Sequence, residues 1–113
     1  MMKIEALIQP FTLDEVKTAL APLGLPGIMI SEVFEYGASA AVKATYRGVE
    51  YRVDAPKVKL EILASSLQVD EVTEALLRAA RTTGPGTDGT ILIYEVADAI
   101  QIRSGDRIKF AVF

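Results

Sequence analysis

Two stretches of the chain alternate between apolar and polar residues, and each is followed by the spacing of an amphipathic helix. In the first stretch one side of the predicted strand carries Ile4, Ala6 and Ile8 and the other carries Lys3, Glu5 and Leu7. The apolar stripe of the helix that follows consists of Leu13, Val16, Ala19, Leu20 and Leu23. Gly24 and Pro26 are typical of its end. The stripe of the second helix consists of Val69, Val72, Leu76 and Ala79–Ala80.

The first helix opens with Thr12-Leu13-Asp14-Glu15, which predicts a capping box in which Thr12 and Glu15 satisfy each other's exposed amides. Both helices carry a pair of acids in the first turn, where the helix dipole favours negative charge. We therefore interpret Asp14 and Glu15 as helix-start residues and not as acid–base catalysts.

The two stretches belong to an internal repeat. Lys3-Ile4-Glu5 recurs as Lys59-Leu60-Glu61, and Asp14-Glu15-Val16 recurs as Asp70-Glu71-Val72, both at an offset of 56 residues. A third segment, 28–33, recurs as 91–96 at an offset of 63, so seven extra residues lie between the second helix and its last strand. Each copy is predicted to be strand, helix, strand.

Two tandem βαβ units predict an α+β, ferredoxin-like fold (βαββαβ) with an antiparallel sheet and both helices on one face. We expect one domain spanning residues 1–113. The uncovered face of the sheet stays apolar at Leu7, Met29, Leu63 and Leu92. It is therefore expected to pack against other copies of the chain.

About twenty residues, 37–56, join the two copies and contain Tyr46-Arg47-Gly48-Val49-Glu50-Tyr51. A loop of that length in a small domain is typical of a functional segment, so we predict a polar, flexible recognition loop. The alternative is a strand extension, because residues 50–54 alternate between polar and apolar.

The second interruption, residues 82–90, is rich in glycine and threonine. Exposed backbone amides and hydroxyls of this kind can cradle phosphate. A plain connecting turn explains the same composition equally well, and the loop has no lysine of the Walker type.

Composition narrows the functional classes. The chain has no cysteine, which fits a reducing cytoplasm, and no histidine, the usual general base at neutral pH. We therefore expect no enzyme activity, no metal site and no required cofactor. A net charge of −3 argues against nucleic acid as a partner, and no apolar run approaches the ~20 residues that span a bilayer. No targeting segment is expected at the N-terminus.

From Met1 to about Asp106 the chain resembles the PII signal-transduction family, which acts in nitrogen regulation. The segments that carry the resemblance are Ile4-Glu5-Ala6, Pro10-Phe11, 46–54, Pro56-Lys57-Val58-Lys59, Asp88-Gly89 and Ile102-Arg103-Ser104-Gly105-Asp106. The resemblance implies a homotrimer that binds adenine nucleotides in clefts between subunits. It also implies that residues 37–56 form the T-loop, which docks on a transporter or metabolic enzyme, and that residues 82–90 form a B-type loop. Tyr51 is the implied uridylylation candidate.

The chain departs from the family pattern where phosphate would be held. Ala38-Ser39 stand where an Arg-Gln pair is usual, Pro85 and Thr90 stand near expected lysines, and Gln101 stands where an arginine is usual. Each charge-assisted hydrogen bond to phosphate contributes ~1.5–3 kcal/mol, so losing three or four weakens ATP binding by several orders of magnitude. The expected effector is therefore an adenine nucleotide (ADP, AMP or ATP), with ADP or AMP favoured over MgATP with 2-oxoglutarate.

An adenine pocket is expected near Met29 and Leu63, and Lys57 and Arg103 are the cations that remain for phosphate. The full set of candidate nucleotide-binding residues is Met29, Gly37, Ala38, Ser39, Lys57, Leu63, Gly86, Thr87, Asp88, Gly89, Thr90, Gln101 and Arg103. The alternative is an interaction protein that acts through the T-loop without a ligand. The C-terminal tail, 104–113, is not family-like beyond Asp106, and Ile108, Phe110 and Val112 predict an edge strand or a subunit clasp.

Overall fold

The computed structural model describes residues 1–36, 42–53, 55–83 and 88–109, the side chains of 42–46 and 50–53 excepted. Six strands, two α-helices and two short 3-10 turns follow one another within these ranges. Their bounds are β1 Met2–Ile8, η1 Pro10–Thr12, α1 Leu13–Leu20, η2 Ala21–Leu23, β2 Ile28–Glu35, β3 Val42–Tyr46, β4 Val49–Val53, β5 Ala55–Ala64, α2 Val69–Ala80 and β6 Gly89–Glu95. None of the helices described is long and apolar enough to cross a membrane.

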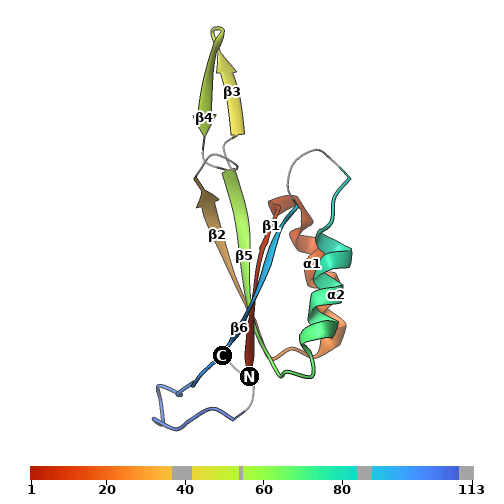
Figure 1. The fold of residues 1–113 in the computed structure, drawn as a ribbon, viewed down its shortest axis with the longest axis vertical. Coiled ribbons are helices and arrows are strands. Elements are labelled where there is room, and N and C mark those ends of the chain that lie inside the picture. The colour runs from red at the N-terminus through yellow and green to blue at the C-terminus, as the bar shows by residue number, and fades with distance from the viewer. Residues whose placement is uncertain (37–41, 54, 84–87, 110–113) are drawn as a thin grey trace.

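Four strands form an antiparallel sheet in the order β2-β5-β1-β6, with α1 and α2 on one face (Figure 1). The central pair β1 and β5 begins the two copies of the repeat, and β2 and β6 end them. This confirms the ferredoxin-like fold and the doubled βαβ unit.

The core lies between the helices and the sheet. Alternation places Ile4, Ala6 and Ile8 there, each at most 2% exposed, as the sequence predicts. Val16 and Leu20 of α1 and Val72 and Leu76 of α2 cover them, which confirms both helical stripes. Gly24 ends the first helical segment in the left-handed conformation, with φ of 65°.

The predicted capping box is wrong. The side chain of Thr12 makes no cap bond to the helix, because its hydroxyl donates instead to the carbonyl oxygen of Gln9 at 2.8 Å. The backbone amide of Thr12 donates to the same carbonyl at 3.0 Å. A 3-10 turn that includes Pro10 thus precedes α1 and occupies the hydroxyl that the capping box requires.

The predicted flexible loop is also wrong over most of its length. Strands β3 and β4 pair as an antiparallel hairpin, with Val42 opposite Val53 and Tyr46 opposite Val49. Arg47 and Gly48 turn the chain with φ of 52° and 76°, the positive angles that a two-residue type I′ hairpin turn requires. The alternative interpretation, a strand extension, is the one that holds for residues 50–53.

The hairpin projects beyond one end of the four-stranded sheet and gives the molecule a long axis of 59 Å (Figure 1). We call this the hairpin end of the sheet. The N-terminus and the end of β6 lie toward the other end, which we call the terminal end.

The face of the sheet without helices mixes apolar side chains with a charged cluster. The apolar residues include Met29 and Leu92, which are 53% and 40% exposed. Between them Lys3 lies 2.8 Å from a carboxylate oxygen of Glu61 and 3.7 Å from one of Glu5. The two glutamates are directly opposite each other in the β1–β5 register, so Lys3 offsets a like-charge pair.

Candidate functional site

Both interruptions of the repeat open at the hairpin end of the sheet. Gly89, the first residue of β6, pairs with Ile8, the last residue of β1, and Ile8 also pairs with Val58 of β5. One residue before Val58, Lys57 is paired with Val33 of β2. The antiparallel register therefore brings the second loop and the base of the hairpin to the same end of the sheet, the hairpin end. Residues from both segments can contribute to one site there.

Asp88 is held in place directly before β6. Its carboxylate accepts a hydrogen bond from the hydroxyl of Thr82, so the two ends of the second loop are joined. The hydrogen bonds from Thr82 lower the pKa of Asp88, and the nearby charge of Arg81 lowers it further. Asp88 therefore presents a carboxylate at neutral pH. The sequence analysis did not single out Thr82 itself, although threonine within a glycine-rich loop is a usable signal.

Gly89 is required by geometry. Its φ is 122°, and a Cβ built on it would collide with the carbonyl oxygen of Leu7 in the neighbouring strand. Strands β1 and β6 approach at this point closely enough that any side chain is excluded. The family resemblance singles out Asp88-Gly89. The structure shows that the backbone also requires glycine at position 89.

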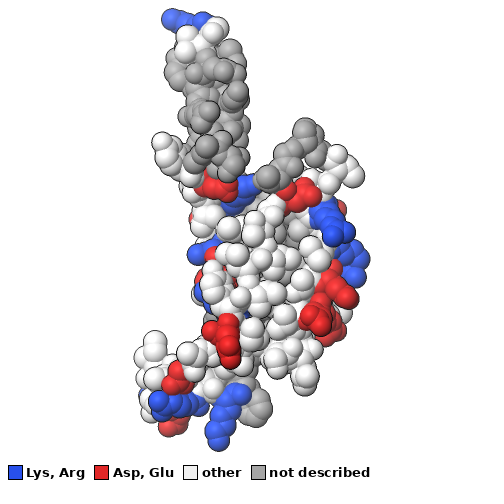
Figure 2. All heavy atoms as spheres, viewed as in Figure 1, with Lys and Arg blue, Asp and Glu red and all other residues white. Residues whose placement is uncertain are grey.

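Lys57 is unusual for a lysine, being only 7% exposed at the base of the hairpin. Acidic and basic side chains meet where the hairpin joins the body of the molecule (Figure 2). A cation held at this junction is placed to meet an anion bound at the hairpin end.

Two other predicted contacts lie farther along the sheet. Met29 pairs with Glu61, and Leu63 pairs with Lys3, so both are toward the terminal end on the face without helices. In one chain they do not adjoin Asp88. The structure separates the predicted adenine contacts from the predicted phosphate contacts.

Gln101 and Arg103 lie in a closed turn of the tail that follows β6. The backbone amide of Gln101 donates to the carbonyl of Asp106 at 2.9 Å, and an ion pair between Arg107 and Asp98 at 2.8 Å closes the base of the turn. Arg103 is exposed within it. Because β6 contains seven residues at ~3.4 Å each, the tail leaves the sheet ~24 Å from Asp88.

The tail does not add an edge strand to the sheet over the part described. Arg107 forms a single bridge with Ile100, and the amide of Ile108 donates to the carbonyl of Ala99 at 2.8 Å. The chain folds back on itself there, which is a local hairpin-like turn. Phe110 and Val112 lie outside the described residues, as do the candidate site residues Gly37, Ala38, Ser39, Gly86 and Thr87.

The remaining candidates are at the start of β6 and in the hairpin. Thr90 pairs with Leu7 and is exposed on the face without helices. The backbone of Tyr51 lies in β4 opposite Ala44. The charged cluster around Lys3, whose ammonium lies 5.8 Å from the centre of the Tyr94 ring, is a feature that sequence analysis missed. Its signal was the repeated Lys-x-Glu at the start of each copy.

A doubled βαβ sheet with both helices on one face, from which a hairpin projects, defines a ferredoxin-like protein. The family model "Nitrogen regulatory protein P-II" matches residues 1–106. A Nitrogen regulatory protein P-II from Pasteurella multocida (strain Pm70) is 42% identical over 113 residues, covering 99% of this chain and 100% of the relative. One from Rhodospirillum rubrum is 46% identical over 108 residues, 95% of this chain and 96% of the relative.

The chain belongs to the nitrogen regulatory protein P-II family. The Nitrogen regulatory protein P-II 1 of Escherichia coli (strain K12) is a further relative, 42% identical over 99% of this chain and 100% of its own length. Membership confirms the resemblance that the sequence motifs carry. It assigns the chain to a class of signal-transduction regulators in nitrogen control, not to a class of enzymes.

Proposed function

We propose that this protein is a homotrimeric regulator whose effector is an adenine nucleotide, ADP or AMP in preference to MgATP with 2-oxoglutarate. The nucleotide binds in clefts between subunits and changes the hairpin β3–β4, which acts as the T-loop. The hairpin then docks on a target enzyme or transporter in the cytoplasm. No covalent chemistry is required of the protein.

The separation of the candidate contacts within one chain supports a nucleotide site between subunits. Asp88 and Gly89 lie at the hairpin end of the sheet, and Arg103 lies in the turn beyond its terminal end, with the ~24 Å length of β6 between them. A single nucleotide bound to one chain does not reach both. A second copy that brings its tail to the hairpin end of the first completes the set of contacts.

The face without helices supplies a surface for that assembly. Its apolar residues Met29 and Leu92 are left exposed in the single chain, and burying them removes apolar area from water. The Lys3–Glu61–Glu5 cluster lies on the same face and would fix the register between copies by charge.

The preference for ADP or AMP follows from the cations that remain. Lys57 at the hairpin end and Arg103 in the tail are suited to one or two phosphates, and Asp88 adds a negative charge beside the strand. The second loop, residues 82–90, contains no lysine or arginine that could bind a third phosphate. The binding free energy of each missing charge-assisted bond is ~1.5–3 kcal/mol.

Isothermal titration with ADP, AMP and MgATP, the last with and without 2-oxoglutarate, tests this proposal. We expect ADP or AMP to bind the trimer and 2-oxoglutarate to leave MgATP binding unchanged. Arg103→Gln should weaken ADP binding at least tenfold, ~1.4 kcal/mol, whereas Arg78→Gln on the exposed side of α2 should not. Tight MgATP binding that depends on 2-oxoglutarate contradicts the proposed effector. The absence of any nucleotide binding would favour the ligand-independent interaction protein instead.

A further inference from the structure

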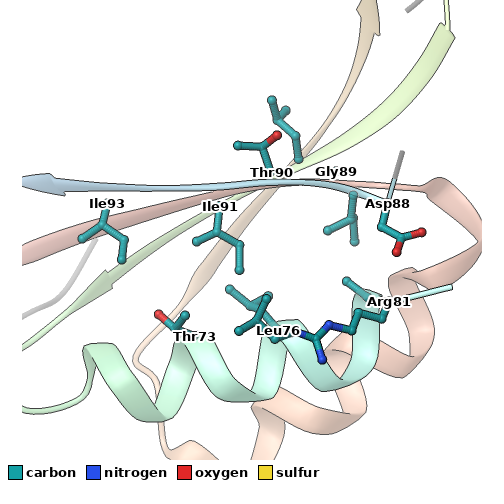
Figure 3. A pocket seen from close by; sticks show the side chains of 12 residues that line it. Thr73, Leu76, Arg81, Asp88, Gly89, Thr90, Ile91 and Ile93 are labelled. Carbon is teal, nitrogen blue, oxygen red and sulfur yellow. The ribbon is translucent and has the colours of Figure 1, made fainter. Parts of the chain in front are cut away.

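A cavity of about 430 Å³ lies between α2 and β6, on the helix side of the sheet. That volume is within the ~300–1,000 Å³ range of small-molecule sites. Its walls are mostly apolar, with Leu76 and Leu77 from the helix and Ile91 and Ile93 from the strand (Figure 3). The cavity lies on the opposite side of the sheet from Met29 and Leu63, so it is distinct from the proposed adenine contacts.

One of the residues that line the cavity, Thr73, carries a buried polar atom. The hydroxyl oxygen of Thr73 is buried and has no hydrogen-bond partner among the residues that the structure describes. Figure 3 places Thr73 on α2 below Ile93. A buried hydroxyl without a partner is destabilising. Because this oxygen is closed off from the open space of the cavity, a ligand atom can bond to it only after the side chain of Thr73 rotates toward the cavity.

The other end of the cavity carries two opposite charges. Asp88 stands at the start of β6, and Arg81 follows the end of α2 with its side chain turned back along the helix (Figure 3). Asp88 is already bonded to Thr82, but a carboxylate has about four lone-pair positions and can accept more bonds. Arg81 is close enough to contribute to the lowered pKa of Asp88.

This arrangement selects a particular charge pattern in a ligand. A net anion would be attracted by Arg81 but repelled by Asp88. A net cation would be attracted by Asp88 but repelled by Arg81. A zwitterion that presents a carboxylate to Arg81 and an ammonium to Asp88 satisfies both. The α-carbon of an amino acid carries these two groups on one atom.

We propose that the cavity between α2 and β6 binds a free α-amino acid with a large side chain that is apolar along its length and polar at its tip. The α-carboxylate binds Arg81, the α-ammonium binds Asp88, and the tip of the side chain bonds to Thr73 once the hydroxyl of Thr73 has rotated into the cavity. Thr73 and Arg81 are eight residues apart on one helix, ~12 Å along its axis, so a long side chain is required. The site shares Asp88 with the proposed nucleotide cleft and would give the regulator a second effector.

The experiment follows the methyl NMR signals of Ile91, Ile93 and Leu76 in the full chain during titration with L-tyrosine. We expect saturable shifts with millimolar affinity. Tyramine, which lacks the carboxylate, and 3-(4-hydroxyphenyl)propionate, which lacks the ammonium, should each bind at least tenfold more weakly, because each leaves one charge unpaired. Equal binding of either analogue overturns the zwitterion assignment.

Thr73→Val tests the inner end of the site with L-phenylalanine as the matched ligand. This substitution should weaken L-tyrosine binding about tenfold and leave L-phenylalanine binding unchanged, since phenylalanine has no hydroxyl to lose a partner. A loss of both equally would mean that the substitution disturbs packing and that Thr73 recognises nothing. Arg81→Gln should weaken both ligands, and Arg78→Gln three residues earlier serves as its control.

No saturable shift of these methyl signals with L-tyrosine or L-tryptophan overturns the proposal. ADP titration of the same sample keeps the two proposals separate. Binding of ADP without any amino acid removes this inference and leaves the proposed function standing, and the reverse result removes the nucleotide proposal alone.

Discussion

The body of the sheet and the projecting hairpin are built from the same local pattern but differ in what covers them. In β1 and β5 the alternating apolar residues face α1 and α2, and Leu60 is 1% exposed. In the hairpin, Val49 beside the turn is 52% exposed. Alternation alone forms strands, and a second layer is what makes them a core. A two-stranded hairpin is marginally stable at best, so its conformation can change without unfolding the body.

The largest expected effect separates these two regions directly. Leu60→Ala should lower the free energy of unfolding by about 3–4 kcal/mol, because it leaves a cavity between sheet and helices. Val49→Ala should change it by less than ~0.5 kcal/mol, because its side chain is half in water already. Chemical denaturation of both variants measures the difference. Similar losses in the two variants would mean that the hairpin is part of the folding core.

Two glycines with positive φ sharpen the same comparison. Gly89→Ala should lower the free energy of unfolding by about 2–3 kcal/mol, because the new Cβ collides with the backbone of Leu7. Gly48→Ala at the hairpin turn should cost ~1 kcal/mol, because its φ of 76° is strained for alanine but nothing lies within 4 Å of the new Cβ. Thermal unfolding followed by circular dichroism checks the order. A larger effect at Gly48 would contradict the close approach of β1 and β6.

Removal of the hairpin should have a smaller effect still. Replacing residues 42–53 with a short glycine-serine link should change the unfolding free energy of the body by no more than ~1 kcal/mol, since loop length enters closure entropy only logarithmically. Denaturant titration of the shortened chain gives the value. ADP titration of the same chain then reports whether the nucleotide site needs the hairpin. A loss of several kcal/mol would show that the body depends on it.

The sequence predicts the body better than the site, and the reasons are physical. Helical and strand periods predict the buried stripe of α1 and the inner face of β1, because burial against one layer imposes them. Arg47-Gly48 is a weaker turn signal than Asn-Gly, so the hairpin was interpreted as a loop. The hydroxyl of Thr12 had two acceptable partners, and the sequence does not decide between the helix and Gln9.

The candidate site could be predicted only in part because its members are held apart in one chain. Asp88 and Gly89 are fixed by local geometry, and the family motifs identify them. The proposed contact of Arg103 with a nucleotide requires a second copy of the chain, and no periodicity in the sequence encodes how copies assemble. Thr73 lines the α2–β6 cavity, and its buried hydroxyl has no partner among the described residues. In the sequence it looks like an ordinary helix residue, and only its burial in the structure distinguishes it.

The smallest expected effect concerns the ion pair on the face without helices. The hydrogen bond from Lys3 lowers the pKa of Glu61 below its ordinary value of 4.5, and the same bond raises the pKa of Lys3 above 10.5. Glu61 therefore contributes to the free energy of unfolding above pH 4.5, and this contribution is lost as the pH falls through its lower folded pKa. Lys3 contributes to the free energy of unfolding below pH 10.5, and this contribution is lost as the pH rises through its higher folded pKa.

Because both side chains are partly exposed, water screens the pair, and its coupling energy should be under ~1 kcal/mol at pH 7. A double-mutant cycle of Lys3→Met and Glu61→Gln measures that energy, with Glu5→Gln as the control at the longer distance of 3.7 Å. The coupling should be constant between pH 6 and 9, decline on acidification, and weaken in high salt. A coupling that persists in acid at full strength would mean that packing of the Lys3 stem, and not charge, joins β1 to β5 on this face.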